Sequence, residues 1–282
     1  STVRGYYKPL TMISLMLDRT RADAPDDLTP YRATNLVLHV ATAVLLVVWL
    51  TQLFGNVWAA AVAGLLFGLH PLTVEPVAWV AGRKTMLATP LVMGALVAWV
   101  RWVHTARRRW YALAAVLFAG SVLAKPTTTL LPVLLLVVDW WPLRRLGWRA
   151  VWEKAPLFAI ALASGVVTLI SQSRAAGVTT PDETGPGRVL LTLAHNVVFY
   201  WRRMIWPADL QLQYPVPSPL SLAHPAVLAG VIGTVVLLAG LGLLAWRGRR
   251  APLAGWTFWF VAILPTMGIV GVTYVIAADR YA

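Results

Sequence analysis

Long apolar segments separated by short polar stretches dominate the chain. A helix needs about 20 apolar residues to cross the hydrocarbon core of a bilayer. Several of the apolar segments are shorter, so core helices of a water-soluble protein are an alternative. The segments leave no polar face to meet water, however, which favours an all-α, polytopic membrane bundle. Eight spans are expected, near residues 34–54, 57–71, 86–104, 110–124, 127–141, 155–172, 223–246 and 252–275.

The composition agrees with a bilayer as the solvent. Hydrophobic residues make up 59% of the 282 positions and charged residues 12%, whereas soluble domains carry about 25% charged residues. These values exclude a disordered chain, and the absence of cysteine excludes a disulfide scaffold and a Cys-ligated metal domain. The net charge is +13, but the basic residues form no single long basic face. Membrane lipids are therefore expected partners, and nucleic acid is not.

The charged residues also orient the predicted spans. All 11 carboxylates lie away from the span centres, as expected when a carboxylate in hydrocarbon costs at least about 2.5 kcal/mol. The loops 101–109, 142–154 and 247–250 hold eleven Lys and Arg. The carboxylates on this side are only Glu153, within a loop, and Asp139, just before one. Because short loops rich in Lys and Arg stay inside, this side is predicted to be cytoplasmic. Asp139 is expected to pair with Arg144 or Arg145.

Residues 189–206 could pass for a ninth span, but they are predicted to form a juxtamembrane helix at the outer face. If this segment crossed, the Arg-rich stretch 247–250 would lie outside. Its polar centre and its Arg202-Arg203 pair also suit a helix lying in the interface. Chemistry is expected on the outer face, where the loops are long.

The resulting organisation is a single membrane domain over residues 1–282. It comprises an outer segment (1–33), six spans (34–172), an outer region (173–222), two spans (223–275) and an outer end (276–282).

The outer loop 70–85 is the densest candidate for chemistry. It contains His70, Glu75, Arg83 and Lys84. The spacing of His70 and Glu75 could place both groups on one helical face, as an acid/base pair requires. The alternative is that His70 ends a helix while Glu75 pairs with Arg83.

Other basic residues are expected at the same boundary of the membrane. Lys125 lies in a tight Ala-Lys-Pro turn, and Arg202 and Arg280 lie in outer segments. Arg and Lys at one depth suit a lipid-linked phosphate or pyrophosphate, although contact with ordinary anionic headgroups or snorkelling is the alternative for each. Tyr214 could stack on a sugar ring, or it could pack in the core.

Several motifs, taken in order, resemble the membrane part of the transmembrane and tetratricopeptide repeat-containing protein family. They are Tyr6-Tyr-Lys-Pro-Leu10, Tyr31-Arg-Ala-Thr-Asn-Leu-Val-Leu-His39, His70-Pro-Leu-Thr-Val-Glu75 with Gly82-Arg-Lys84, Ala124-Lys-Pro126, Asp139-Trp-Trp-Pro-Leu143, Trp206-Pro-Ala-Asp-Leu210 with Tyr214-Pro215, and Ala278-Asp-Arg-Tyr281. The composition, rich in Ala, Val, Arg and Trp, suggests a bacterial relative.

The resemblance implies a GT-C-type glycosyltransferase that takes a sugar from a polyprenyl-phosphate carrier. The acceptor would be a hydroxyl of a protein or glycan at the outer, periplasmic face of a bacterial inner membrane. No cofactor or metal site is expected beyond this donor. The roles implied are catalytic for Glu75 and Asp279, lipid-phosphate binding for Arg83, Lys84, Lys125, Arg202 and Arg280, and sugar or acceptor binding for His70 and Tyr214.

The chain also departs from the family pattern. Thr73 stands where relatives commonly have a second His, and Thr85 where they have Asp. A preceding span with an acidic pair, and C-terminal spans with tetratricopeptide repeats, are expected to lie beyond a fragment. A non-catalytic subunit of a larger membrane complex is therefore the alternative. A transporter is disfavoured, because no ionisable residue is predicted at mid-bilayer depth.

Overall fold

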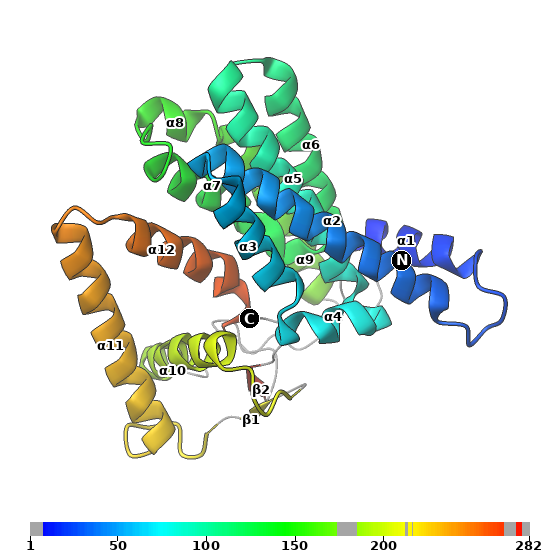
Figure 1. Ribbon diagram of the computed structural model, residues 1–282. Helices are drawn as coiled ribbons and strands as arrows, with labels where there is room; N and C mark the ends of the chain where they lie inside the picture. Colours follow the sequence, from blue (N-terminus) through cyan, green and yellow to red (C-terminus); the bar gives the residue numbers. More distant parts are fainter. Residues whose placement is uncertain (1–7, 174–184, 212–213, 216, 268–274, 278–282) are drawn as a thin grey trace. The chain divides into compact units, whose positions relative to one another are not determined.

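The computed structural model describes residues 8–173, 185–211, 214–215, 217–267 and 275–277. Its helices and strands are labelled in Figure 1. The chain divides into two compact units, which we describe one at a time. Unit 1 comprises residues 1–139 and 145–175, and unit 2 comprises residues 140–144 and 176–282.

Unit 1 is entirely helical over the described residues. A long helix α5 packs against both α2 and α6, while the short α1 packs on α2, α5 and α6. The helices of this part are α1 (Pro9–Arg19), α2 (Thr29–Phe54), α3 (Val57–Gly68), α4 (Val74–Ala78), α5 (Arg83–Thr105), α6 (Arg108–Ala124), α7 (Leu131–Trp140), α8 (Trp148–Trp152) and α9 (Ala155–Ser173), with 3₁₀ turns η1 (Pro71–Thr73), η2 (Val80–Gly82) and η3 (Pro126–Leu130).

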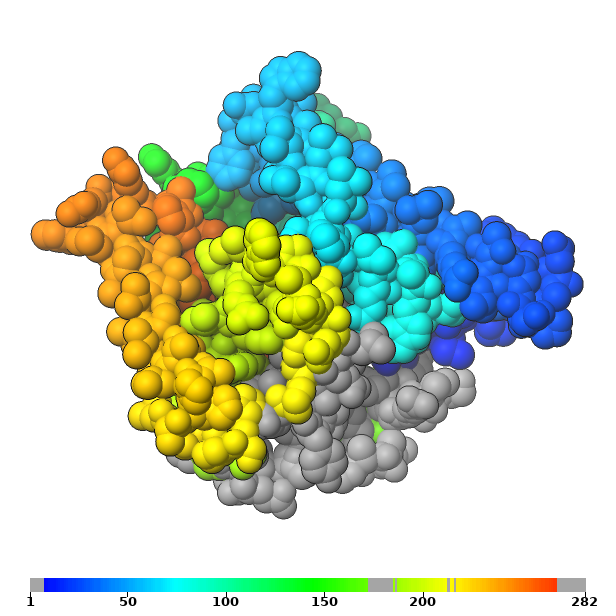
Figure 2. Space-filling model, turned by 60° about the horizontal axis from the view of Figure 1, so that its bottom comes forward, coloured from blue at the N-terminus to red at the C-terminus, as the bar shows by residue number. Residues whose placement is uncertain are grey.

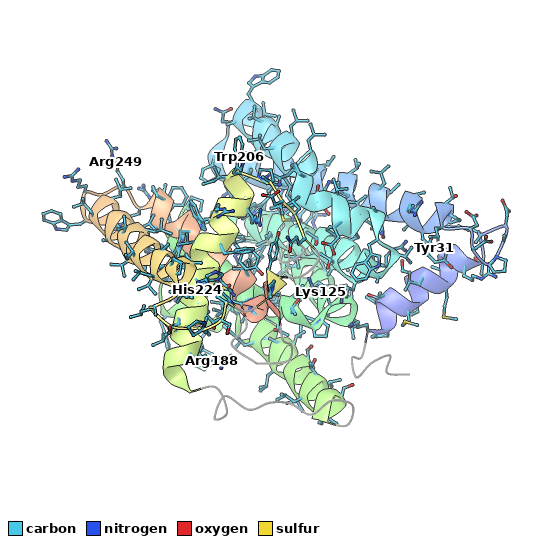
Figure 3. The ribbon with its side chains drawn as sticks, turned by 90° about the horizontal axis from the view of Figure 1, so that it is seen from below. Tyr31, Lys125, Arg188, Trp206, His224 and Arg249 are labelled. Atoms are coloured by element: carbon cyan, nitrogen blue, oxygen red, sulfur yellow. The ribbon has the colours of Figure 1, made fainter. Side chains whose placement is uncertain are left out.

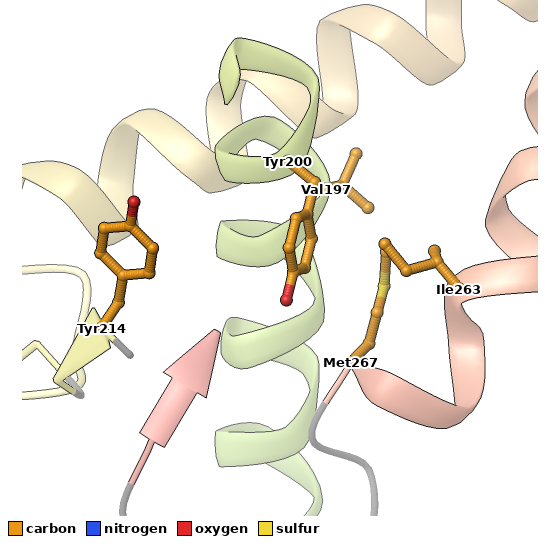
Figure 4. Packing of buried hydrophobic residues seen from close by; sticks show 5 residues of the cluster. All are labelled: Val197, Tyr200, Tyr214, Ile263 and Met267. Carbon is orange, nitrogen blue, oxygen red and sulfur yellow. The ribbon is translucent and has the colours of Figure 1, made fainter. Parts of the chain in front are cut away.

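Unit 2 is built around α10, which packs along α11 and contacts a small two-stranded sheet. The two strands are antiparallel. The elements are α10 (Pro186–Ile205), β1 (Tyr214–Pro215), α11 (Pro225–Trp246), α12 (Ala251–Ile263), η5 (Leu264–Thr266) and β2 (Val275–Ala277). Figure 4 shows the core of this unit, where Tyr200 and Val197 of α10 lie beside Ile263 and Met267.

Local sequence explains the tight hairpin of α2 and α3. Gly55 ends α2 with a φ of 71°, a left-handed conformation that glycine adopts without a steric penalty. Asn56 then caps α3, because its side chain accepts a hydrogen bond from the backbone N–H of Ala59 at 3.0 Å. At Gly64 a Cβ atom would lie 2.4 Å from Cγ2 of Val47, so a side chain there would push the two helices apart.

Many large apolar side chains lie on the surface of both units. Trp58 on α3 is 81% exposed and Leu162 on α9 is 70% exposed, and α2 and α11 also present Val and Leu outward. A soluble protein rarely exposes so much apolar surface, whereas lipid chains would cover it. An all-α, membrane-embedded, multi-pass protein accounts for this surface.

Four described helical segments are long and apolar enough to cross a membrane, and a bent pair makes a fifth. The bent pair joins 57–68 to 71–78 at an angle of 54°. The four segments are Thr29–Phe54, Val80–Thr105, Trp148–Ser171 and Pro225–Trp246. They correspond to four of the eight expected spans.

The other expected spans are shorter as helices. Pro126 and Pro132 break the region 127–141 into a 3₁₀ turn and a helix of 10 residues. Helix α12 ends at Ile263, ahead of Pro265, and residues 268–274 lie outside the described part. The segment 189–206 lies largely in helix α10, which is not among the described helices long and apolar enough to cross a membrane.

A buried group of charges lies near the C-terminal half of α5. The carboxylate of Asp139 has no exposed surface. It accepts hydrogen bonds from Nε1 of Trp99 at 3.1 Å and from Nζ of Lys154 at 2.5 Å. Arg145 approaches it at 3.7 Å. Asp139 therefore pairs with Arg145, one of the two expected partners, and more closely with Lys154, which the sequence did not indicate.

Replacing Asp139 by Asn should destabilise unit 1 by about 3–5 kcal/mol, because it leaves the buried ammonium of Lys154 without its closest counter-charge. The free energy of unfolding in detergent micelles measures this loss. The double variant Asp139→Asn/Lys154→Met should recover most of it. The matched control is Asp26→Asn at an exposed carboxylate, expected to change the value by less than about 0.5 kcal/mol. If Asp139→Asn lowered the free energy of unfolding no more than Asp26→Asn does, the prediction would be contradicted.

Candidate functional site

The segment 70–82 is not one continuous helix. His70 precedes the 3₁₀ turn η1, and its Nδ1 accepts a hydrogen bond from the backbone N–H of Leu72 at 3.2 Å. This bond leaves the ring proton on Nε2. Glu75 follows in the short helix α4. His70 therefore caps a new turn at the end of α3, and the two groups do not share the face of a single helix. Figure 2 shows this segment in cyan at the surface of unit 1.

Two contacts hold this segment against the rest of unit 1. The side-chain amide of Asn35 donates hydrogen bonds to the backbone carbonyls of Val77 and Trp79, at 3.0 and 3.3 Å. At Gly82 a Cβ atom would lie 2.3 Å from the carbonyl oxygen of Pro76, so glycine is required for α4 and η2 to approach. The half-buried Glu75 is thereby carried on a helix that packs against α5.

Arg83, the first residue of α5, has no exposed surface. Its Nε donates to Oδ1 of Asn35 at 2.6 Å, and its terminal nitrogens donate to Oγ of Ser14 at 2.7 Å and to the carbonyl of Tyr31 at 2.8 Å. An ion pair with Asp18 at 2.5 Å completes the set. The guanidinium thus uses its donors within the protein, and a lipid phosphate has no access to it.

This network holds Arg83 in place inside unit 1, where its guanidinium positions α1 and α2 against the start of α5. Its ion-pair partner is Asp18 on α1, not Glu75 as one interpretation of the sequence proposed. Sequence reasoning missed Asp18. The spacing of Ser14 and Asp18 could have indicated it, because residues four apart lie on one face of a helix and can contact the same partner. Thr34 on α2 also donates to Asp18, at 2.8 Å.

Lysine residues gather beside Arg83, at the start of α5. Lys125, in the turn between α6 and η3, donates a hydrogen bond from Nζ to Oγ1 of Thr85 at 3.1 Å. Lys84 precedes Thr85 in the chain and acts electrostatically on Lys8 at the start of α1. We refer to Lys8, Lys84 and Lys125 as the lysine cluster. Figure 3 labels Lys125, whose place in its turn fixes it near α5.

The environment of Lys8 disfavours its charge. Partial burial and, to a smaller extent, the neighbouring Lys84 together lower the pKa of the Lys8 ammonium from 10.5 to about 8. An anion placed in the lysine cluster would reverse this effect and favour the charged form. Lys8 was not among the residues expected to bind phosphate, although it lies in the Tyr6–Leu10 motif.

Two further candidate residues, Arg202 and Tyr214, line one cavity in unit 2. This cavity has a volume of about 320 Å³ and lies between α10, the start of α11 and the residues Tyr214, Pro215 and Pro217. Arg202 is exposed. The wall also contains His195 and Phe199, whose rings stack with centroids 5.8 Å apart.

Tyr214 itself belongs to the core of unit 2 and is 8% exposed. Its ring meets Phe199 edge-on at 4.7 Å between centroids, and the guanidinium of Arg203 lies over it at 5.0 Å. Its hydroxyl donates to the carbonyl of Asp209 at 3.1 Å and accepts from the backbone N–H of Gln211 at 3.0 Å. The ring of Tyr214 thus packs mainly in the core. Only the part of the ring that lines the cavity could contact a ligand.

The candidates therefore fall into separate groups. Lys84 acts on Lys8, and Lys125 bonds to Thr85, the residue after Lys84. His70 and Glu75 lie on the neighbouring segment of unit 1. Arg202 and Tyr214 share the cavity of unit 2. Asp279 and Arg280 lie outside the described residues. Over the described part of the chain, no group of three His, Cys, Asp or Glu side chains could hold a metal ion.

Arg83→Ala should lower the free energy of unfolding by about 3–5 kcal/mol, because it removes the closest counter-charge of the buried carboxylate of Asp18 and leaves, among the described residues, only the exposed Arg21 at 3.8 Å. Arg83→Lys should lose nearly as much, since a single ammonium cannot reach the four partners that the guanidinium fork contacts. Unfolding in detergent measures both. The exposed Arg32 gives the control Arg32→Ala. If Arg83→Ala were as stable as this control, the positioning function would be excluded.

Comparison with known proteins gives one partial match. A stretch of 129 residues, 44% of the chain, is 33% identical to the protein O-mannosyl-transferase Tmtc2 of Drosophila melanogaster. The stretch covers 14% of the fly protein, so the chain spans a small part of that relative's length. No protein-family model and no solved structure matches the chain. The similarity supports a relationship between this chain and the transmembrane and tetratricopeptide repeat-containing proteins.

Proposed function

We propose that this chain is the membrane part of a glycosyltransferase that moves a sugar from a polyprenyl-phosphate donor to an acceptor hydroxyl of a protein or glycan. The partial identity to a protein O-mannosyl-transferase supports sugar transfer and makes mannose the first sugar to test. In this proposal the fold is of the GT-C type. The reaction takes place at the outer, periplasmic face of a bacterial inner membrane.

The lysine cluster is the observation that carries the proposal. Burial and, after it, the neighbouring Lys84 disfavour the charged form of Lys8, and Lys125 donates to Thr85, the residue that follows Lys84 in α5. A phosphate bound beside Lys8 and Lys84 would favour the charged form of Lys8. The N-terminus of α5 adds its positive dipole end at the same place.

The reaction breaks the bond between the anomeric carbon of the sugar and the phosphate oxygen. The polyprenyl phosphate leaves with the electron pair, the acceptor oxygen bonds to the anomeric carbon, and the acceptor proton passes to a base. In our proposal the lysine cluster stabilises the departing phosphate. Glu75, on the helix that packs against α5, takes the proton.

The remaining candidates have supporting roles in the same proposal. His70 orients the sugar or acceptor beside Glu75. Arg202 is an exposed cation for the lipid phosphate in the cavity of unit 2, and Tyr214 closes one edge of that cavity. Asp279 and Arg280 are proposed as a second carboxylate and a further phosphate ligand.

Lys125→Ala should slow sugar transfer about 100-fold, as the loss of one preorganised donor to a developing negative charge does in other enzymes. The assay supplies labelled polyprenyl-phosphate mannose and a Ser/Thr-containing acceptor peptide to the full-length protein in nanodiscs. Arg249→Ala, at an exposed residue of a short basic loop, should leave the rate unchanged. Absence of transfer by the wild type, with donor binding unaffected in Lys125→Ala, would refute the proposed activity.

Donor binding should weaken as the pH rises from 7 to 9, because Lys8 loses its charge near its pKa of about 8. The donor is a phosphodiester and keeps one negative charge over this range, so the change reports on the protein. Binding of the donor to the protein in nanodiscs, measured at several pH values, tests this.

Two variants of Lys8 serve as controls for the pH dependence. In Lys8→Gln the donor affinity should be independent of pH and equal to the weak affinity of the wild type at pH 9. In Lys8→Arg it should stay at the strong affinity of the wild type at pH 7. A wild-type affinity that does not change over this range would remove Lys8 from the phosphate site.

A non-catalytic membrane subunit is the second candidate, and Thr85 favours it. Its neutral hydroxyl accepts the hydrogen bond of Lys125 at a position where relatives commonly carry Asp. A scaffold without that carboxylate could bind a lipid phosphate and transfer nothing. Donor binding without turnover, together with stoichiometric co-purification with other membrane proteins, would support the subunit.

A further inference from the structure

Besides the cavity of unit 2, a cavity in unit 1 plays no part in the proposed transfer. It has a volume of about 990 Å³ and lies between the end of α5, the start of α6 and the residues around α8. Its walls combine aromatic and charged side chains, chiefly Trp102, Tyr111, Trp152, Arg108, Arg145 and Glu153. Two candidate spans, Val80–Thr105 and Trp148–Ser171, have one end here. The cavity therefore lies at the depth where helices leave the hydrocarbon.

The aromatic wall of the cavity is firmly held. The rings of Trp102 and Tyr111 meet edge-on, 5.2 Å apart, and Trp99 packs on both. The hydroxyl of Tyr111 donates to the backbone carbonyl of Glu153 at 2.8 Å. Because this bond ties α6 to the residue after α8, the cavity is preformed and does not need to be opened by a ligand.

The charges at the cavity do not cancel. Arg145 lies over the ring of Trp102 at 5.2 Å and pairs with Glu153 and Asp139. Together with the buried Lys154, these residues form a neutral group of two cations and two carboxylates. Arg108 in the wall adds a positive charge to this group. The adjacent exposed Arg107 and Arg109 extend it, so an anion is favoured.

An apolar rim stands beside this positive region. Trp148 and Trp152 on α8 are 72% and 60% exposed, and their rings meet at 90° with centroids 5.5 Å apart. Leu146 just before α8 is 49% exposed. Exposed tryptophans next to arginines are typical of the membrane interface, where rings lie among the headgroups.

We propose that this cavity binds the headgroup of an anionic phospholipid. In this proposal the phosphate accepts hydrogen bonds from the guanidinium groups of Arg108 and Arg145. The glycerol and the upper acyl chains lie on Trp152 and Trp148. A soluble phosphate would use the arginines and leave the apolar rim exposed. The rim therefore favours a lipid as the occupant.

The test compares phosphatidylglycerol with phosphatidylcholine, which share their acyl chains and differ in net charge. Native mass spectrometry of the full-length protein measures how many molecules of each lipid are retained from mixed micelles. Phosphatidylglycerol should be retained preferentially. Arg108→Ala should weaken its binding about fivefold, the effect of one interfacial cation.

Arg249→Ala is the matched control, because it removes an exposed arginine from another short basic loop without changing this cavity. It should leave phosphatidylglycerol retention within about twofold of the wild type. Trp152→Ala provides a second variant that keeps every charge, and it should also weaken retention because the lipid loses its apolar wall. This variant decides the question if Arg108→Ala does not fold.

Three results would overturn the proposal. Equal retention of the two lipids would remove the preference for negative charge. Equal losses in Arg108→Ala and Arg249→Ala would assign the effect to general surface charge. Glycerol 3-phosphate protecting the protein against thermal unfolding as well as phosphatidylglycerol does would identify a soluble phosphate as the ligand.

Discussion

The burial of one positive charge, the guanidinium of Arg83, organises the first half of this protein. Removing an ion from water costs several kcal/mol unless partners compensate it, and here the compensation comes from two other helices. Ser14 and Asp18 of α1, and Tyr31 and Asn35 of α2, meet the fork at the start of α5. Asn35 also holds the carbonyls of the segment that bears Glu75. The same charge thus fixes the position of Lys84 and of the loop beside it.

Helix α5 carries a polar anchor in each half. Arg83 begins it, and Trp99 reaches the pair of Asp139 and Lys154 near its other end. Between the anchors lie buried apolar residues such as Leu96. The two candidate ligand sites of unit 1 lie at opposite ends of α5. The lysine cluster is at its start, and the aromatic cavity is at its end. In our proposals, one helix would therefore position an anion site at each of its ends, with different chemistry at each.

Hydropathy alone predicted the helical class and four of the spans, because a continuous apolar run has few other stable states in a bilayer. It overestimated the length of other helices, since Pro126, Pro132 and the cap at His70 interrupt apolar sequence without changing its hydropathy. The buried pairs were harder to foresee. Asp18 pairs with Arg83, which is distant along the chain. Lys154 pairs with Asp139, for which the sequence suggested the nearer Arg144 or Arg145. Lys8 emerged as a candidate only when the fold brought it beside Lys84.

The pair of Asp18 and Arg83 has a consequence for how the chain is made. Asp18 leaves the ribosome before the first candidate span, and its partner begins a later one. At the usual speed of synthesis several seconds separate the two residues. During that interval the carboxylate must stay in water, so α1 cannot take its final place until α5 has been inserted. Helix α1 therefore docks only after a helix that is made later than itself, and its docking depends on the correct placement of the start of α5.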